Sequence, residues 1–73
     1  MKRDDLSPYI ELCDFLKAKG IVSTGGQAKL LIRAGDVKVN KMVETRVKKK
    51  LRDGDVVETD GKKLGVKKEE LFV

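Results

Sequence analysis

Two groups of basic side chains carry the chemistry that this sequence offers. Lys29 and Arg33 are four residues apart, and residues 46–50 hold an arginine and three consecutive lysines. Two cations four apart on a helix repel slightly, so such a pair gains only when an anion lies across it. Just before this pair, Gly25 and Gly26 would leave first-turn backbone N–H groups open to a phosphate. The pattern therefore predicts an anion-binding surface.

Each of these features also has a purely structural explanation. Paired glycines at a helix start permit close packing against another backbone, and we weigh this equally with phosphate binding. Charged residues on a helix are usually only solvated. Three adjacent lysines often mark a solvated edge or loop, and lysine on an edge strand deters aggregation.

A helix start and a helix stop bracket the first basic pair. Thr24 and Gln27 have the spacing of a capping box, and Ser23 is an equally good cap one residue earlier. Gly35 stands where a helix commonly ends in the left-handed conformation. Residues 36–40 then alternate between apolar and polar, as in a strand that ends in a turn.

The helix between these signals has an apolar face. At about 100° per residue, Ala28, Leu31 and Ile32 share one side. We expect Leu30 and Ala34 to widen it. The prediction is a mostly buried helix with one charged ridge.

An earlier helix is expected at about residues 12–19, with Gly20 as its stop. Ile10 begins an alternation typical of a short strand that leads into it. Ser7 and Pro8 could instead open a helix, as cap and first residue. Both alternatives are kept at this point.

The second half of the chain is expected to form strands. Residues 42–47 have an extended pattern that the lysine run can prolong, and residues 53–55 form a turn. Residues 56–57 begin another strand. The Asp-Gly pair at 60–61 predicts a two-residue hairpin leading into residues 64–66.

Length and composition limit the class of protein. The chain has 73 residues and a net charge of +5, with 40% charged and 4% aromatic residues. A chain this short forms one domain with a small aliphatic core, so we expect a single domain over residues 1–73. The charge favours nucleic acid or an anionic membrane surface as partner.

The sequence lacks the residues for a catalytic or metal centre. Histidine is absent and Cys13 is the only cysteine, so zinc sites and Ser-His or Cys-His pairs have no groups to use. Cys13 has apolar neighbours and is expected to be a buried small hydrophobe. Asp53 and Asp55 flank a glycine and are better explained as turn formers. We expect no catalytic residue, metal or cofactor, and a reducing setting.

Neither a signal peptide nor a membrane span is indicated. No apolar run approaches the ~20 residues of a spanning helix. Peripheral membrane binding through the lysines would also need an amphipathic helix with an exposed apolar face, which the pattern does not predict. We therefore expect a soluble, cytoplasmic protein without a membrane partner.

An ordered set of residues runs through most of the chain. Its members are Ser23, Gly25, Gly26, Ala28, Lys29, Leu31, Ile32, Gly35, Val37, Val39 and Asn40, then Glu44-Thr45-Arg46, Lys50-Leu51 and Gly54-Asp55. The set resembles the S-four domain, also called the alpha-L RNA-binding motif, over about residues 10–58.

The resemblance implies an α+β fold with two short packed helices against a small antiparallel sheet, and it favours the strand before the first helix. Domains of this family dock on structured RNA, at helical junctions or hairpins, through shape and phosphate contacts. Ribosomal or transfer RNA, and the ribosome, are thus the expected partners of a monomer. The family varies most at the end, so residues 67–73 stay unassigned.

The basic surface and the resemblance together predict the RNA-binding residues. They are Gly25, Gly26, Lys29, Arg33, Lys38, Arg46, Lys48, Lys49 and Lys50. Many members carry an arginine beside the serine at the second helix start, where this chain has Thr24 and Gly25, so that contact is either replaced by backbone amides or lost. Most members ride on a larger protein such as a pseudouridine synthase. This chain looks like the small free-standing bacterial versions, which implies an accessory role in ribosome assembly, ribosome rescue or RNA handling.

A small DNA-binding protein of helix-turn-helix type is the alternative. It would need polar base-reading side chains on the second helix, where Leu30 and Ile32 fit a major groove poorly. The aromatic residues Tyr9, Phe15 and Phe72 are scattered and expected to be buried. They would then offer no stacking platform for single-stranded RNA, which favours recognition of the RNA backbone.

Overall fold

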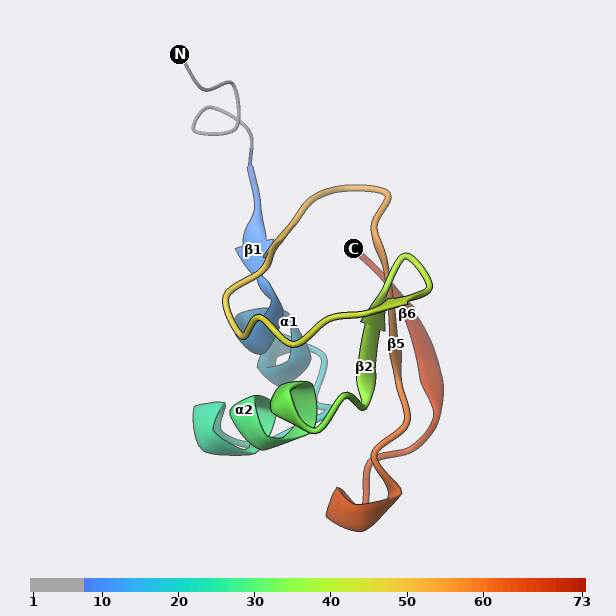
Figure 1. Ribbon diagram of the computed structural model, residues 1–73. Coiled ribbons are helices and arrows are strands. Elements are labelled where there is room, and N and C mark those ends of the chain that lie inside the picture. The colour runs from blue at the N-terminus through green and yellow to red at the C-terminus, as the bar shows by residue number, and fades with distance from the viewer. Residues whose placement is uncertain (1–7) are drawn as a thin grey trace.

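The computed structural model describes residues 8–73, and it confirms the expected α+β fold (Figure 1). Two helices cover one face of a four-stranded antiparallel sheet, and a two-stranded sheet lies beside the first helix. The elements in chain order are β1 (Ile10–Glu11), α1 (Leu12–Ala18), α2 (Gly25–Arg33), β2 (Val37–Val39), β3 (Met42–Val43), β4 (Lys50–Leu51), β5 (Val56–Thr59), the 3-10 helix η2 (Lys62–Leu64) and β6 (Glu69–Phe72).

Helix α1 forms as the pattern of apolar residues predicts. Leu12, Phe15 and Leu16 are buried, and Gly20 has a φ of +74° just beyond the helix. Strand β1 precedes α1 directly, so Pro8 is not a helical residue. Ser7, the other residue of that alternative, lies outside the described part of the chain.

Helix α2 starts and stops at the predicted signals. The Gln27 amide donates to Thr24 Oγ1 at 3.1 Å, and the Gln27 side chain accepts from the Ser23 amide at 2.8 Å. Thr24, rather than Ser23, is therefore the cap. Gly35 follows the helix with a φ of +83°. The hydrogen bonds between Thr24 and Gln27 and between Ser23 and Gln27 satisfy amides that have no partner inside the helix.

The buried face of α2 is narrower than the sequence analysis predicts. Ala28, Leu31 and Ile32 are fully buried, but Leu30 is 60% exposed and Ala34 is exposed. At 100° per residue, Leu30 lies roughly 150° from the centre of the buried face, so it cannot widen that face. The prediction of a mostly buried helix was wrong, because only one side of α2 packs against α1 and the sheet.

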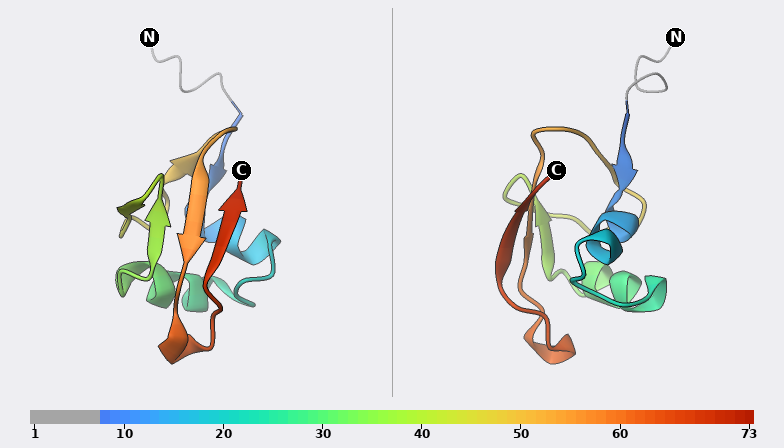
Figure 2. Two further views of the ribbon diagram at one scale, coloured as in Figure 1. Left: turned by 90° about the vertical axis from the view of Figure 1, so that its right-hand side faces the viewer. Right: turned by 180° about the vertical axis from the view of Figure 1, so that it is seen from behind.

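The four-stranded sheet has the order β3-β2-β5-β6, with every neighbouring pair antiparallel. Val37, Val39 and Val57 are buried in the hydrophobic core, and α1 and α2 lie on one side of the sheet (Figure 2). Lys38 alternates with the two valines and is exposed, as predicted. Lys38 and Glu58 are partners on the opposite, outer face. Charged residues thus keep that face in water.

A two-residue turn joins β2 to β3. Asn40 and Lys41 have positive φ values of 52° and 71°, which suits a tight hairpin. The Asn40 amide donates to the Val56 carbonyl at 2.8 Å, and Asn40 Oδ1 accepts from the Val56 amide at 3.0 Å. Asn40 therefore connects this turn to the start of β5.

The strand predicted over residues 42–47 is shorter, because β3 ends at Val43. The following segment leaves the sheet and turns over the start of α1 (Figure 1). There the Lys49 carbonyl accepts from the Leu12 amide at 2.8 Å, and the Val47 carbonyl accepts from the Cys13 amide at 3.1 Å. These amides begin α1 and have no acceptor within the helix. Of the basic run, only Lys50 belongs to a strand.

The turn at residues 53–55 is confirmed, with Gly54 at a φ of +95°. The two-residue hairpin at residues 60–61 is wrong. Gly61 is buried, and a Cβ atom at this position would overlap the Leu31 side chain. The chain instead forms η2, and the Val66 amide returns to the Gly61 carbonyl at 2.9 Å. The unassigned tail then forms β6, which pairs with β5.

Among residues 8–73, neither helix has the length and apolar character that a membrane crossing needs.

Candidate nucleic-acid interface

Five cationic side chains line a single open depression of about 410 Å³. We call them the basic cluster, and they are Arg46, Lys48, Lys49, Lys50 and Arg52. All residues that line the depression are arginine or lysine, so the cluster presents several positive charges to one ligand. Such a hollow suits a polyanion.

The start of α1 holds the loop that carries most of the cluster. Two helix amides donate to loop carbonyls, as described above, and the Lys49 amide donates to the Arg46 carbonyl at 3.3 Å within the loop. Lys50 pairs with Glu11 across β1 and β4. The cluster thus sits on backbone that is hydrogen-bonded to two neighbouring elements.

Glu44 orients Arg46. Glu44 Oε2 accepts from the Arg46 side-chain Nε at 2.9 Å and from the Arg46 amide at 3.0 Å. The side-chain hydrogen bond with Arg46 holds the pKa of Glu44 below its ordinary value, and the same bond raises the pKa of Arg46. Arg46 is therefore held in place, with part of its charge compensated.

Asp55 positions the backbone at Arg52. Asp55 Oδ2 accepts from the Arg52 amide at 2.9 Å, and Asp55 Oδ1 accepts from Asn40 Nδ2 at 3.1 Å. The backbone bond from Arg52 is the largest cause that lowers the pKa of Asp55, followed by the bond from Asn40. This carboxylate ties the turn after β4 to the turn between β2 and β3.

The three lysines of the cluster form no ion pair within the described chain. Within residues 8–73, ion pairs join Lys17 to Asp14 and Arg46 to Glu44, and none includes Lys48, Lys49 or Lys50. Neighbouring like charges that form no close ion pair favour the approach of an anionic ligand.

Of the other predicted residues, four lie on α2. Lys29 and Arg33 are exposed one turn apart, and Gly25 and Gly26 form the first turn. A methyl group at Gly25 would meet no atom within 4 Å in the described chain, and one at Gly26 would meet only Thr24 Oγ1 at 3.8 Å. Close backbone packing therefore does not explain the paired glycines. Their amides lie at a helix start, where no intrahelical acceptor exists.

The loop at residues 44–49, which carries Arg46, Lys48 and Lys49 of the basic cluster, lies on the side of the sheet that the helices cover. Figure 1 and the right-hand view of Figure 2 show the segment after β3 leaving the sheet and crossing to the side where α1 and α2 lie. The loop that carries most of the cluster and helix α2 therefore lie on the same side of the four-stranded sheet. The depression itself includes no residue of α2.

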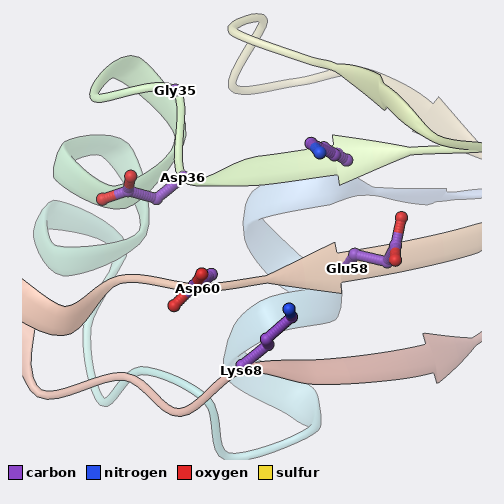
Figure 3. Close-up of a pocket in the computed structure, with 6 residues that line it drawn as sticks. Gly35, Asp36, Glu58, Asp60 and Lys68 are labelled. Carbon is purple, nitrogen blue, oxygen red and sulfur yellow. The ribbon is translucent and has the colours of Figure 1, made fainter.

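Lys38 is separated from the basic cluster. It lines a different depression, on the outer face of the sheet, together with Asp36, Glu58, Asp60 and Lys68 (Figure 3). The acidic residues there outnumber the lysines. The structure therefore does not bring Lys38 together with the other predicted binding residues.

The sequence analysis missed two residues, Arg52 and Tyr9. Arg52 follows Lys50 by two positions, and that spacing puts both on one side of an extended strand. The expectation that all three aromatic residues are buried was wrong for Tyr9 and Phe72, which are 46% and 65% exposed. Phe15 alone is buried. No local pattern could have shown that Tyr9 lies beside the basic cluster.

Three potential metal ligands come together at the start of α1. The ligand atoms of Glu11, Cys13 and Asp14 lie within 4.8 Å of one another. Their closeness follows from their neighbouring positions in the chain. Cys13 is partly buried against the core, in line with its expected role as a small hydrophobe.

The fold and the depression define a small α+β domain with a polycationic surface. The chain matches the family model described as S4 domain over residues 5–67, and it belongs to this family of RNA-binding domains. The predicted resemblance to the S-four domain is thereby confirmed.

Two curated relatives match most of the chain. A protein of Escherichia coli (strain K12) named "Putative RNA-binding protein YbcJ" is 44% identical over 59 residues, which cover 81% of this chain and 84% of that protein. A Shigella flexneri protein named "Uncharacterized protein YbcJ" matches with the same identity and coverage. No solved structure gives a significant match.

Proposed function

We propose that this protein binds structured RNA, ribosomal or transfer RNA, through phosphate contacts and catalyses no reaction. The observation that carries the proposal is the depression lined only by the five cations of the basic cluster. Membership of the S4 domain family supports RNA as the polyanion.

Binding would draw its affinity from the RNA backbone. Each phosphate neutralised by a cation releases counterions, which lowers log K by about 0.7 to 0.9 per unit of log salt. Full engagement of the five cations would therefore give a slope of roughly 3.5 to 4.5. Such contacts position the RNA and carry no base sequence information by themselves.

Helix α2 would add a second set of phosphate contacts. Lys29 and Arg33 provide two exposed cations, and the amides of Gly25 and Gly26 open at the positive end of the helix dipole. A folded RNA with two backbone segments, as at a hairpin or a junction, can reach α2 and the basic cluster together. Lys38 lies on the other face and is not included in this surface.

The wider proposal concerns the cellular role. The protein would act in the cytoplasm as a monomeric, single-domain accessory factor in ribosome assembly, ribosome rescue or RNA handling. It would need no cofactor, metal or membrane. The family to which the chain belongs is generally non-catalytic, which supports a role in binding alone.

A direct test compares RNA binding by matched charge variants. The triple variant Lys48→Ala, Lys49→Ala and Lys50→Ala removes the lysines of the basic cluster. The control Lys62→Ala, Lys63→Ala and Lys67→Ala makes the same charge change at exposed positions around η2, at the bottom of Figure 1. Fluorescence anisotropy with a labelled hairpin RNA should show a large loss of affinity and a lower salt slope for the first variant only.

Equal losses in both variants would refute the basic cluster as the binding surface. A duplex DNA competitor that displaces the hairpin better than RNA does would favour the DNA-binding alternative. Crosslinking in the native cells, followed by recovery under denaturing conditions and sequencing, would then identify the RNA. Defined ribosomal or transfer RNA sites that are lost in the triple variant would establish the target.

A further inference from the structure

Tyr9 stands at the edge of the basic cluster. Ile10 is opposite Leu51 and Glu11 is opposite Lys50 across β1 and β4. Because side chains alternate along extended backbone, Ile10 and Leu51 share the face that packs on the core. Tyr9 therefore lies on the outward face, together with Lys50 and Arg52.

Two cations of the cluster contact the Tyr9 ring. Lys50 Nζ lies 4.9 Å from the ring centroid, and Arg52 Cζ lies 5.7 Å from it. Both distances are within the range of cation–π interaction. Tyr9 as a residue nevertheless remains 46% exposed, so the two cations do not cover it completely.

A shallow hollow of about 160 Å³ adjoins the ring. Pro8, Tyr9, Ile10 and Val73 line it together with Asp53, and Leu51 beneath them is fully buried. Arg52 lines both this hollow and the cationic depression. The exposed part of Tyr9 thus adjoins a cationic surface that suits phosphate. A nucleotide has two parts that complement these two surfaces, a flat base with π faces and an anionic phosphate.

The other aromatic residues lack this arrangement. Phe15 has Lys19 Nζ 5.6 Å from its ring centroid, but Phe15 is only 3% exposed. Phe72 is exposed and pairs with Val56 in the four-stranded sheet, but within residues 8–73 no cation lies over its ring. Among residues 8–73, only Tyr9 combines an accessible ring with cations of the basic cluster.

We propose that Tyr9 is a stacking platform for one unpaired RNA base, whose flanking phosphate binds Lys50 and Arg52. This inference rests on the proposed RNA-binding function and specifies the RNA feature that is recognised. A base inside a continuous duplex is already stacked on its neighbours. Only a bulged, junction or terminal unpaired nucleotide can place its face on the ring. The protein therefore prefers structured RNA with such a nucleotide over a fully paired duplex.

The test uses three RNA duplexes of one sequence. The first is fully paired, the second has a single-nucleotide bulge, and the third has an abasic nucleotide at the bulge. The third duplex keeps the phosphate and the distortion but removes the base. Tyr9 is the only tyrosine and the chain has no tryptophan, so intrinsic tyrosine fluorescence reports on this ring alone.

We expect the bulged duplex to bind about 5-fold to 150-fold more tightly than the abasic one, in line with alanine substitution at stacking aromatics. Tyr9 emission should be quenched by the bulged duplex and much less by the abasic one. Tyr9→Leu should lose the preference but keep the salt-dependent affinity for the paired duplex. Tyr9→Phe should retain the preference, and the control Phe72→Leu should leave it unchanged.

Equal binding of bulged and abasic duplexes by the unmodified protein would overturn the inference, as would a preference that survives in Tyr9→Leu. Two further comparisons separate this failure from that of the proposed function. If the lysine triple variant loses affinity for all three duplexes while Tyr9→Leu changes nothing, only the stacking inference fails. If the unmodified protein binds none of the RNAs, the proposed function fails as well.

Discussion

Replacement of Asn40 by alanine should destabilise the protein through both its side chain and its backbone. Asn40 Nδ2 donates to Asp55 Oδ1, and Asn40 Oδ1 accepts from the Val56 amide. The residue also has a φ of +52°, which asparagine tolerates better than alanine. Loss of the side chain would release the link between the β2–β3 turn and the turn that positions Arg52.

The expected cost follows from these contacts. Each net hydrogen bond contributes about 0.5 to 1.5 kcal/mol, so the two bonds account for about 2 kcal/mol. The left-handed conformation costs alanine about a further 1 to 2 kcal/mol. Asn40→Ala should therefore lose about 3 kcal/mol of unfolding free energy. Asn40→Gly relieves the backbone term, and its greater unfolded-chain entropy offsets part of the relief, so it should recover about 0.5 to 1 kcal/mol.

Urea unfolding of the two Asn40 variants, of Asp55→Ala and of the Asn40→Ala/Asp55→Ala double variant would test this account. The double variant should lose less free energy than the sum of the single changes, because both remove one shared hydrogen bond. Additive losses, or an Asn40→Ala variant as stable as the parent, would show that this network does not hold the two turns together.

Three further predictions concern packing, pH and charge. Gly61→Ala should lower the free energy of unfolding in urea by about 1 to 3 kcal/mol, because the new Cβ meets buried Leu31. Gly25→Ala, at an open position, should not lower it. Similar losses in both variants would contradict the packing of Gly61 against Leu31. Folding lowers the pKa values of Glu44 and Asp55 from 4.5 and 3.8, so the unfolded state binds protons more readily than the folded state. The two carboxylates therefore stabilise the fold above about pH 5, and this stabilisation is lost as the pH falls through their folded-state pKa values. Urea midpoints at pH 7 and pH 3 should differ less in a Glu44→Gln/Asp55→Asn variant than in the parent, and an unchanged difference would exclude these carboxylates as the cause. Glu44→Gln alone should strengthen RNA binding at low salt by a small factor, since it removes the carboxylate that pairs with Arg46. This gain in affinity should vanish at high salt. A loss of affinity would mean that the orientation of Arg46 matters more than its net charge.

The features predicted correctly from the sequence depend on neighbours close in the chain. The cap of α2 joins Thr24 to Gln27, three residues apart, and Gly20 and Gly35 end helices through their own backbone conformation. The alternation of β2 also follows from the strand itself. Because both partners of such an interaction lie within one short segment, the local sequence pattern is sufficient to predict it.

The incorrect predictions involve contacts between distant segments or a misjudged helix face. Strand β3 ends at Val43, earlier than predicted, because the following segment supplies carbonyls to the start of α1, some 35 residues earlier in the chain. The hairpin after Asp60 fails because Gly61 packs against Leu31. Leu30 was placed on the buried face although the helical period alone puts it nearly opposite.

The candidate site shows the same division. The sequence by itself determines the net charge, the lysine run, the helix ends and the resemblance to the S-four domain, because these depend on composition, local order and motif. Only the tertiary structure decides which cations meet. The pairing of β1 with β4 brings Tyr9 beside Lys50 and Arg52. Lys38 lies on the outer face of the four-stranded sheet, apart from these residues. Charge is a sum over residues, whereas a binding surface depends on long-range strand pairing, which no local pattern encodes.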